Sequence, residues 1–396
     1  MKRRVPIDTY CEKAIAILPK TYNGLIDYID ISSVDNTEKK IVSFQTIDAK
    51  DAPSRAKQLL KKGEVIVSTV RPNLNAVAIV ENETENLIVG STGYCVLRCK
   101  ESLDARYLFS FCQSQYFIDD MSSQATGASY PAVSTSIVKS SLIPWSSIEE
   151  QREVAAKLNA VGRLISLRKK QLSKLDELIK SRFIELFGDP VSNSMGLSTE
   201  AMTEVCAIID GDRGKNYPKQ DEFSDTGYCL FLNAKNVTAT GFSFENCMYI
   251  TEEKDNALRN GKLERGDVVL TTRGTLGNLA FYDDSVPFEN VRINSGMVIL
   301  RMKKGVVSEV FFIEQFKLQL QSIKEKIASG SAQPQLPIST MNKIRVLLPP
   351  MELQEQFAAF VEQTDKSKLA IQKSLDKLET LKKALMQKYF GLGINI

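Results

Sequence analysis

The pattern of apolar positions predicts two long helices, and the first occupies residues 148–188. Apolar residues there recur in alternating steps of four and three, which is the 3.5-residue repeat of a coiled coil rather than the broader stripe of a surface helix. The seam consists of Val154, Leu158, Val161, Ile165, Leu172, Leu175, Ile179 and Leu186, broken only by Arg168 and Arg182. Ser146 and Ser147, each followed three residues later by glutamate, predict the helix start, and Gly188-Asp189-Pro190 predicts its end.

A second seam, at a constant offset of 203 from the first, supplies its partner. It consists of Phe357, Val361, Thr364, Lys368, Ile371, Leu375, Leu378, Lys382, Leu385 and Tyr389. Charged positions in one seam correspond to apolar positions in the other, and a mismatched pairing would bury charge. The pattern therefore favours one specific pairing, and because each helix follows a domain and the chain must return, the two helices most simply pack antiparallel. Two unrelated amphipathic helices, each packed on its own domain, are the alternative, which the shared offset disfavours.

The stretches that precede the two helices repeat one order of elements. Strands and then a helix are predicted at 25–34, 64–70, 76–80, 87–97 and 105–121, and again at 227–237, 267–272, 279–282, 291–302 and 309–328. KGEVIVST (62–69) matches RGDVVLTT (265–272) at the same offset, which indicates an internal duplication. Two features depart from it. The Glu-Gln pairs at the helix starts are 205 apart, which predicts a two-residue slip, and the first stretch has fewer residues before IDISSV (29–34) than the second has before LNAKNV (232–237).

The chain is therefore predicted to be an α+β protein with an internal pseudo-two-fold repeat. Two tandem domains, each of small mixed sheets with helices, are separated by two long antiparallel coiled-coil helices. The predicted boundaries are 1–146 for the first domain, 147–188 for the central helix, 189–350 for the second domain and 351–391 for the C-terminal helix.

Composition narrows the range of functions. The chain has 396 residues, a formal net charge of +3 and no histidine, which excludes Ser-His and Cys-His catalysis and HExxH metal sites. Seven cysteines without framework spacing indicate reduced thiols, and Cys95 and Cys99 are predicted to be small buried residues rather than zinc ligands. We expect a cytoplasmic protein, because the sequence shows neither a signal peptide nor an apolar run of membrane-spanning length.

Together with this repeat, three motifs, EEQREVAAKL (149–158), LFGDP (186–190) and STVRPNLNAVAIV (68–80), make the chain resemble the specificity subunit of type I restriction-modification systems. GDRGKNYPK (211–219) and the paired G-x-x-x-P loops add to a resemblance that covers essentially the whole chain. It implies two target-recognition domains, each reading half of a bipartite sequence in double-stranded DNA. The helices would dock two modification subunits, and restriction subunits would join them. The resemblance implies no cofactor on this chain, since S-adenosylmethionine, ATP and Mg belong to the partner subunits.

Side-chain chemistry suggests which residues contact DNA. Arg71 and Arg273 follow strand ends and could clamp guanine, while Asn73, Asn75 and Asn278 could pair with adenine. Hydroxyl groups suit phosphate contacts, and the candidates are Thr69, Thr272 and Thr275. Two glycine-containing loops, 126–136 and 329–340, add Ser129, Tyr130 and Gln333, and a basic loop adds Arg213, Lys215, Tyr217 and Lys219. Ordinary loop polar groups are the alternative. DNA contact is favoured for the arginines, and both interpretations stay open for the hydroxyl residues.

Two rival functions fit the sequence less well. A stand-alone DNA methyltransferase or nuclease is disfavoured, because the sequence lacks an N/D-P-P-Y/F loop and a glycine-rich cofactor fingerprint. A coiled-coil scaffold that binds only protein would leave the two duplicated domains unexplained. The sequence therefore favours a non-catalytic reader of DNA sequence.

Overall fold

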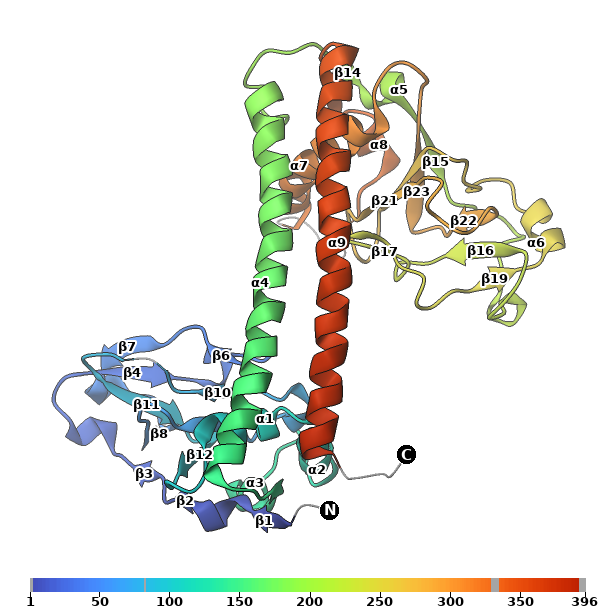
Figure 1. Cartoon of the computed structure of the whole chain (residues 1–396). Helices are drawn as coiled ribbons and strands as arrows, with labels where there is room; N and C mark the ends of the chain where they lie inside the picture. Colours follow the sequence, from blue (N-terminus) through green and yellow to red (C-terminus); the bar gives the residue numbers. More distant parts are fainter. Residues whose placement is uncertain (1–2, 82, 329–334, 392–396) are drawn as a thin grey trace. The chain divides into compact units, whose positions relative to one another are not determined.

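The computed structural model describes residues 3–81, 83–328 and 335–391. The chain divides into two compact units. The first unit comprises residues up to Lys170 together with those from Gln372 onward, and the second comprises Gln171 to Ile371. These units cut across the predicted domain boundaries, because each long helix contributes one part to each unit (Figure 1).

The two long helices have the same length and lie at the offset of the repeat. Helix α4 (Ile148–Phe187) and helix α9 (Met351–Phe390) both have 40 residues, and their first and last residues are each 203 apart. The predicted two-residue slip at the helix starts is therefore wrong. Ser147 caps α4, since its hydroxyl accepts the Glu150 N–H at 3.3 Å.

Two buried glutamines show how the helix starts correspond. The side-chain oxygen of Gln151 accepts the N–H of Asp104, the residue before a domain helix, at 3.0 Å. Gln354 does the same in the second half of the chain, where it accepts the N–H of Ser308, which also precedes a domain helix, at 3.0 Å. Gln151 therefore corresponds to Gln354 and not to Gln356, with which the predicted slip had matched it.

The predicted seam is present in both units. Every predicted interface residue of the two seams is buried or half-buried. In the first unit the start of α4 shares a core with the end of α9, and in the second unit the end of α4 shares a core with the start of α9. Ion pairs join Lys169 to Glu379 (3.6 Å) in the first unit and Lys368 to Asp176 (2.7 Å) in the second. The antiparallel pairing is thus confirmed.

Each long helix ends in a buried phenylalanine that the heptad pattern did not include. The Phe390 ring lies 5.3 Å from that of Tyr107 and 5.8 Å from that of Phe111 in the first unit. Phe187, the equivalent last residue of α4, packs against Phe311 at 4.9 Å in the second unit. These rings pack the end of each long helix into the hydrophobic core of a domain.

The first unit contains two main sheets and three short helices. A four-stranded sheet has the order β10 (Val77–Ile79), β9 (Val65–Ser68), β12 (Tyr94–Cys99) and β2 (Cys11–Glu12). A five-stranded sheet has the order β3 (Ile15–Ala16), β8 (Ala56–Leu59), β11 (Leu87–Ser91), β4 (Leu25–Ile29) and β7 (Gln45–Asp48). Two strand pairs and the helices complete it: β1 (Arg4–Pro6) with β13 (Leu142–Pro144), β5 (Val34–Asp35) with β6 (Lys40–Ile41), α1 (Ala105–Cys112), α2 (Gln115–Ser123) and α3 (Thr135–Ser140).

The second unit repeats this plan with a smaller second sheet. Its four-stranded sheet has the order β15 (Cys206–Asp210), β23 (Met297–Met302), β20 (Asp267–Thr271) and β21 (Leu279–Tyr282). The other sheet has the order β19 (Tyr249–Ile250), β16 (Cys229–Leu232) and β22 (Val291–Ile293). The remaining elements are β14 (Thr199–Ala201) with β24 (Arg345–Leu347), β17 (Val237–Thr238) with β18 (Gly241–Phe242), α5 (Met202–Val205), α6 (Glu252–Ala257), α7 (Glu309–Ala328) and α8 (Ile338–Met341).

The duplication holds at the level of strand register. Tyr94 pairs with Ser68 in the first unit, and the equivalent Met297 pairs with the equivalent Thr271 in the second. A buried acid at the start of a central strand of each sheet binds an arginine: Glu64 binds Arg98, and Asp267 accepts two bonds from Arg301 at 2.9 and 2.8 Å. The predicted pseudo-two-fold repeat is confirmed.

Two predicted strands are in fact pairs of strands. The stretch 87–97 forms β11 and β12, and the stretch 291–302 forms β22 and β23, with each pair divided between two sheets. The chain turns at Gly93, where an added Cβ would lie 2.4 Å from the Ile31 side chain. The predicted helix 105–121 is likewise two helices, whereas 309–328 is one continuous helix as predicted.

The shortened entry of the first domain is also confirmed. Glu12 and Ala207 occupy equivalent positions, because they pair with Arg98 and Arg301. The segment that runs from Glu12 to Ile29 in the first unit is shorter than the segment that runs from Ala207 to Leu232 in the second.

Candidate DNA interface

A threonine at the end of a central strand anchors the candidate interface in each unit. In the first unit, the backbone N–H and the hydroxyl of Thr69 both donate to the Gly93 carbonyl at 2.9 Å, and the Val133 N–H donates to the Thr69 carbonyl at 2.9 Å. The second unit repeats all three bonds with Thr272, Gly296 and Leu336. Both threonines are buried, and their hydroxyl and backbone groups together join three segments.

Arg71 lies in the turn that follows this anchor, and we call residues 69–76 the Arg71 turn. Its backbone is in the left-handed region, with φ 48° and ψ 61°. The Arg71 N–H donates to the Pro131 carbonyl at 2.7 Å, and the Arg71 carbonyl accepts the Leu74 N–H at 2.9 Å. The guanidinium carbon lies 4.9 Å from the centre of the Tyr130 ring. The backbone is thus fixed while the Arg71 side chain is exposed.

A braced loop presents Tyr130, whose side chain is 70% exposed. Thr126 and Ala132 exchange two backbone hydrogen bonds of 2.9 Å at the base of this loop. Gly127 has φ 104°, and an added Cβ there would lie 2.9 Å from the Tyr130 carbonyl oxygen, so the turn requires glycine. Between the loop and the Arg71 turn lies a pocket of about 360 Å³, which is lined by Ile31, Val34, Asn36, Ser68, Val70, Arg71, Leu74, Ala76 and Tyr130.

Asn75 serves the fold of this turn. Its amide nitrogen donates to the Cys112 carbonyl at 2.8 Å, and its side-chain oxygen accepts the Lys39 ammonium at 2.9 Å. Burial and the nearby charge of Lys382 lower the pKa of Lys39 to about 8. Because both ends of the buried Asn75 amide are bonded within the fold, this side chain is not available to a base. Asn73, by contrast, is exposed.

Arg273 does not occupy the position of Arg71. Arg273 bridges to Gln335 as Val70 bridges to Ala132, so Arg273 corresponds to Val70. Gly274, with φ 70°, takes the place of Arg71. The following turn is one residue shorter, because Leu270 pairs with Leu279 whereas Val67 pairs with Val77. Arg273 is exposed at a pocket of about 250 Å³ that Asp210 and Arg213 also line.

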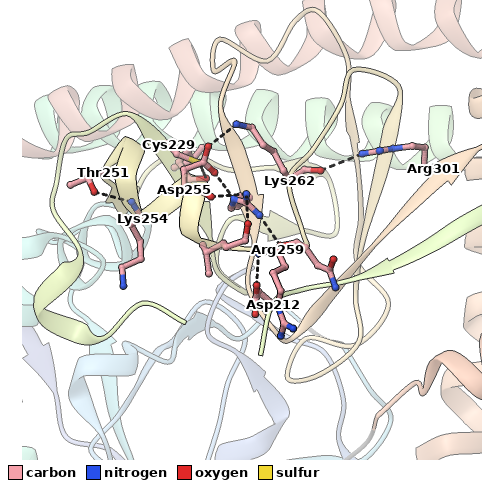
Figure 2. A network of polar contacts seen from close by, with 12 residues as sticks. Asp212, Cys229, Thr251, Lys254, Asp255, Arg259, Lys262 and Arg301 are labelled. Carbon is pink, nitrogen blue, oxygen red and sulfur yellow. Dashed lines mark hydrogen bonds and ion pairs between the residues drawn. The ribbon is translucent and has the colours of Figure 1, made fainter. Parts of the chain in front are cut away.

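The basic loop at 211–219 is held by a buried carboxylate. Asp212 accepts the N–H groups of Gly214 at 2.6 Å and of Arg259 at 2.7 Å (Figure 2). Burial by itself would raise the pKa of Asp212, but the hydrogen bonds from these N–H groups outweigh burial, so the pKa is lowered. An ion pair of 3.1 Å joins Arg213 to Asp210. The loop is thus anchored while the side chains of Arg213 and Lys215 are exposed.

A buried network of charged side chains also lies in the second unit. Asp255 is fully buried and binds Arg292 and Lys262, the latter at 2.6 Å (Figure 2). Arg292 also donates to the carbonyls of Asn260 (2.8 Å) and Leu258 (3.2 Å). Although burial raises the pKa of Asp255, the bonds from Lys262 and Arg292 lower it overall. The network fixes α6 and the segment leading to Arg259 on strand β22.

The structure separates the predicted contact residues into two groups. The exposed ones are Arg71, Asn73, Ser129, Tyr130, Arg213, Lys215, Lys219, Arg273 and Thr275. Four others are engaged within the fold: Thr69, Asn75, Thr272 and Asn278, whose amide donates to the Val237 carbonyl at 2.9 Å. Tyr217 packs edge-on against Phe231 at 5.8 Å. Gln333 lies outside the described residues.

Sequence reasoning missed Arg259, which is exposed beside the basic loop. A Cβ added to Gly214 would lie 2.8 Å from a guanidinium nitrogen of Arg259. Its position follows only from the bond between its N–H and Asp212, 47 residues earlier. No sequence signal marked it.

Within the described part of the chain, no group of three or more metal-binding side chains was found. Among the same residues, no helix is long and apolar enough to cross a membrane.

Comparison with known proteins identifies the family. The model of the type I restriction modification DNA specificity domain matches residues 12–177 and 199–383, once for each half of the repeat. The chain belongs to this family. Specificity subunits recognise DNA sequence, and catalysis lies in the partner subunits, so this specificity chain is a non-catalytic DNA reader.

Individual specificity subunits are similar along nearly the whole length. The MjaIX specificity subunit of Methanocaldococcus jannaschii is 22% identical over 387 residues, covering 93% of this chain and 86% of its own. A chain from a structural study of type I complex assembly is 25% identical with a TM-score of 0.57, covering 98% of both chains. The S subunit from M. genitalium, 18% identical, has the same fold with a TM-score of 0.59.

Proposed function

We propose that each domain of this specificity chain reads one half of a bipartite target in double-stranded DNA. The observation that carries the proposal is the duplicated anchor of Thr69 and Thr272, beside which the two units expose different side chains. The hydrogen bonds of the anchor are the same in both units, whereas the exposed side chains beside it differ. This arrangement suits two domains that read different bases. The first domain would read through Arg71, Asn73 and the Tyr130 loop, and the second through Arg273, Arg213, Lys215 and Arg259.

Substitution of one arginine in each domain tests this assignment. With its modification subunits bound, the Arg71→Ala protein should lose discrimination in one half-site only, and Arg273→Ala in the other only. A lost bidentate contact to guanine is worth about 1–3 kcal/mol, or roughly 5- to 150-fold in discrimination. Methylation of duplexes with one altered base pair at a time measures the loss. Each variant controls for the other, and relaxation of both half-sites by one substitution would refute the assignment.

The two long helices are proposed to dock two modification subunits. Outside the seam, leucines remain exposed on both helices. Leu178 on α4 is 47% exposed, and the equivalent Leu381 on α9 is 46% exposed. Further exposed leucines are Leu164 and Leu167 on α4 and Leu369 on α9. Equivalent apolar positions on two equivalent helices suit two copies of one partner.

Charge substitution at those leucines tests the docking surface. Leu178→Glu and Leu381→Glu should each reduce the number of bound modification subunits from two to one, as counted by native mass spectrometry. Lys180→Glu and Lys383→Glu are matched controls, because these exposed lysines lie two residues further on and about 200° around each helix. Loss of a modification subunit from the lysine variants but not from the leucine variants would place the docking surface on the opposite face of each helix.

The cofactors are proposed to belong to the partners. The modification subunits would bind S-adenosylmethionine, and restriction subunits would bind ATP and Mg. Purified alone, the chain should transfer no labelled methyl group to DNA, whereas the reconstituted complex should. Methyl transfer by the chain after removal of every partner would contradict this division.

A further inference from the structure

The backbone of the Arg71 turn points to a special role for the Arg71 side chain. A residue with a Cβ is strained at φ 48°, and such strain persists where the surrounding structure or a function maintains it. The duplicated unit supplies the comparison, because Gly274 holds the equivalent left-handed position at φ 70° without that strain. The first unit therefore keeps an arginine at the position where its repeat, in a turn one residue shorter, has glycine.

Tyr130 fixes the direction of that side chain. The Arg71 guanidinium lies over the Tyr130 ring, and the ring stands on a loop closed by the Thr126 and Ala132 pair. The same loop holds the Arg71 backbone through the Pro131 carbonyl. A cation–π contact engages the charge of the guanidinium and does not use up its N–H donors. Both the backbone and the side chain of Arg71 are thus oriented before any DNA arrives.

We propose that Arg71 reads a guanine in the half-site of the first domain and that Tyr130 is its positioning residue, acting through its ring. This inference rests on the proposed function and extends it to one base. The N–H donors of a guanidinium match the paired O6 and N7 acceptors that guanine alone presents in the major groove. The pocket beside it is lined by the apolar side chains of Val34, Val70 and Leu74 and by the polar side chains of Asn36 and Ser68.

The experiment compares two substitutions of one ring. In the complex with modification subunits, Tyr130→Phe keeps the ring and should leave discrimination unchanged. Tyr130→Ala should reduce discrimination at a single guanine by about 2- to 5-fold, the range expected for an exposed cation–π contact. Binding to non-specific DNA should be equal for both variants. Competition binding with duplexes altered at each base pair of the half-site supplies the readout.

The Arg71→Gly variant distinguishes an effect on base discrimination from an effect on the stability of the fold. Glycine relieves the left-handed strain, so this variant should unfold at a higher temperature than Arg71→Ala while losing guanine discrimination to the same extent. A lower unfolding temperature for Arg71→Gly would overturn the claim that the position is strained.

The outcomes distinguish the inference from the proposed function. If Arg71→Ala changes no base preference, the proposed assignment of Arg71 fails. If Arg71→Ala relaxes one guanine but Tyr130→Ala behaves like Tyr130→Phe, the positioning role alone fails. If Tyr130→Ala weakens binding to every sequence equally, Tyr130 contacts the DNA backbone and the inference is refuted.

Discussion

Lys39 links the β5–β6 hairpin to the Arg71 turn through its bond to Asn75. Burial is the main cause of its lowered pKa, Lys382 on α9 adds like-charge repulsion, and Asp35 opposes both. In the unfolded chain the pKa of Lys39 returns to its usual value of about 10.5. The folded protein therefore releases this proton before the unfolded chain does.

This difference predicts a pH dependence. Between pH 8 and about 10.5 the unfolded chain binds the extra proton, so the contribution of Lys39 to the free energy of unfolding should rise with pH in this window. Thermal unfolding of the wild-type protein and of Lys39→Met measures it. The wild type should gain stability relative to the variant as pH rises from 8 to 10. A constant difference between the two proteins would show that Lys39 titrates normally when folded.

Cys11 and Cys99 form a second residue-scale feature, since they are directly opposite on strands β2 and β12. The next pair along the ladder is hydrogen-bonded, because the Lys100 N–H donates to the Tyr10 carbonyl at 2.9 Å. Cys11 and Cys99 are thus a non-hydrogen-bonded pair, where Cα atoms lie about 4.5 Å apart, at the short end of the disulfide range. The bond between the two thiols lowers the pKa of Cys11.

Mild oxidation should therefore join these two cysteines. Treatment with oxidised glutathione would remove two protons and two electrons from the thiols, reducing the glutathione disulfide. The closed loop of nearly ninety residues should stabilise the first unit by up to about 4 kcal/mol, less any strain. Peptide mapping without reductant identifies the bond, and Cys11→Ser is the control. Oxidation of Cys206 or Cys229 in preference to this pair would contradict the prediction.

At the scale of elements, the ends of the long helices matter more than the heptad pattern suggested. Phe390 is fully buried and contacts Tyr107 and Phe111, all within the first unit. Phe390→Ala should cost about 3–5 kcal/mol of stability, as other buried phenylalanines do. Hydrogen exchange should show the loss in α1 and the end of α9. Leu381→Ala, at an exposed position on the same helix, is the control and should change exchange little.

The first and last described segments of the chain meet in the first unit, a feature that involves the whole molecule. The Arg4 guanidinium donates to the carbonyls of Phe390 (2.7 Å) and Gly391 (2.9 Å). The internal linker from Gly188 to Thr199 makes the corresponding connection in the second unit. A circular permutant, with Ile396 joined to Met1 and a new opening at the exposed Met195–Gly196 bond, should therefore fold and direct methylation to the same target. A changed target would show that chain order contributes to recognition.

The length of the helices provides a further whole-molecule prediction. One extra heptad in both α4 and α9, in register, adds about 10 Å of helix. If the helices set the spacing between the two reading domains, the non-specific gap in the target should grow by about 3 base pairs, at about 3.4 Å each. Sequencing of methylated sites would show both half-sites unchanged. An active protein with the original gap would mean that the helices serve only for docking.

The sequence by itself determined the long helices, their seam and the duplication. These features are local or periodic, so a heptad pattern or a constant offset between two similar halves is visible without knowing any contact. The antiparallel pairing also followed, because each helix follows a domain and the chain must return, so the two helices most simply pack antiparallel. The exposure of Arg71 and Tyr130 could also be anticipated from local sequence, because the proline, asparagine and glycine residues near them are typical of turns, and turns lie at the surface.

Only the tertiary structure decided which side chains those loops leave free. Asn75 and Asn73 are two residues apart in one motif, yet Asn75 is occupied by Lys39 and Cys112, which lie 36 and 37 residues away. Arg273 follows a strand end as Arg71 does, but its bridge to Gln335 makes it the counterpart of Val70, one position earlier in the turn. The strands 87–97 and 291–302 divide because their halves pair with strands of different sheets. Hydrogen-bond partners distant in sequence fix each of these outcomes, and no local pattern encodes them.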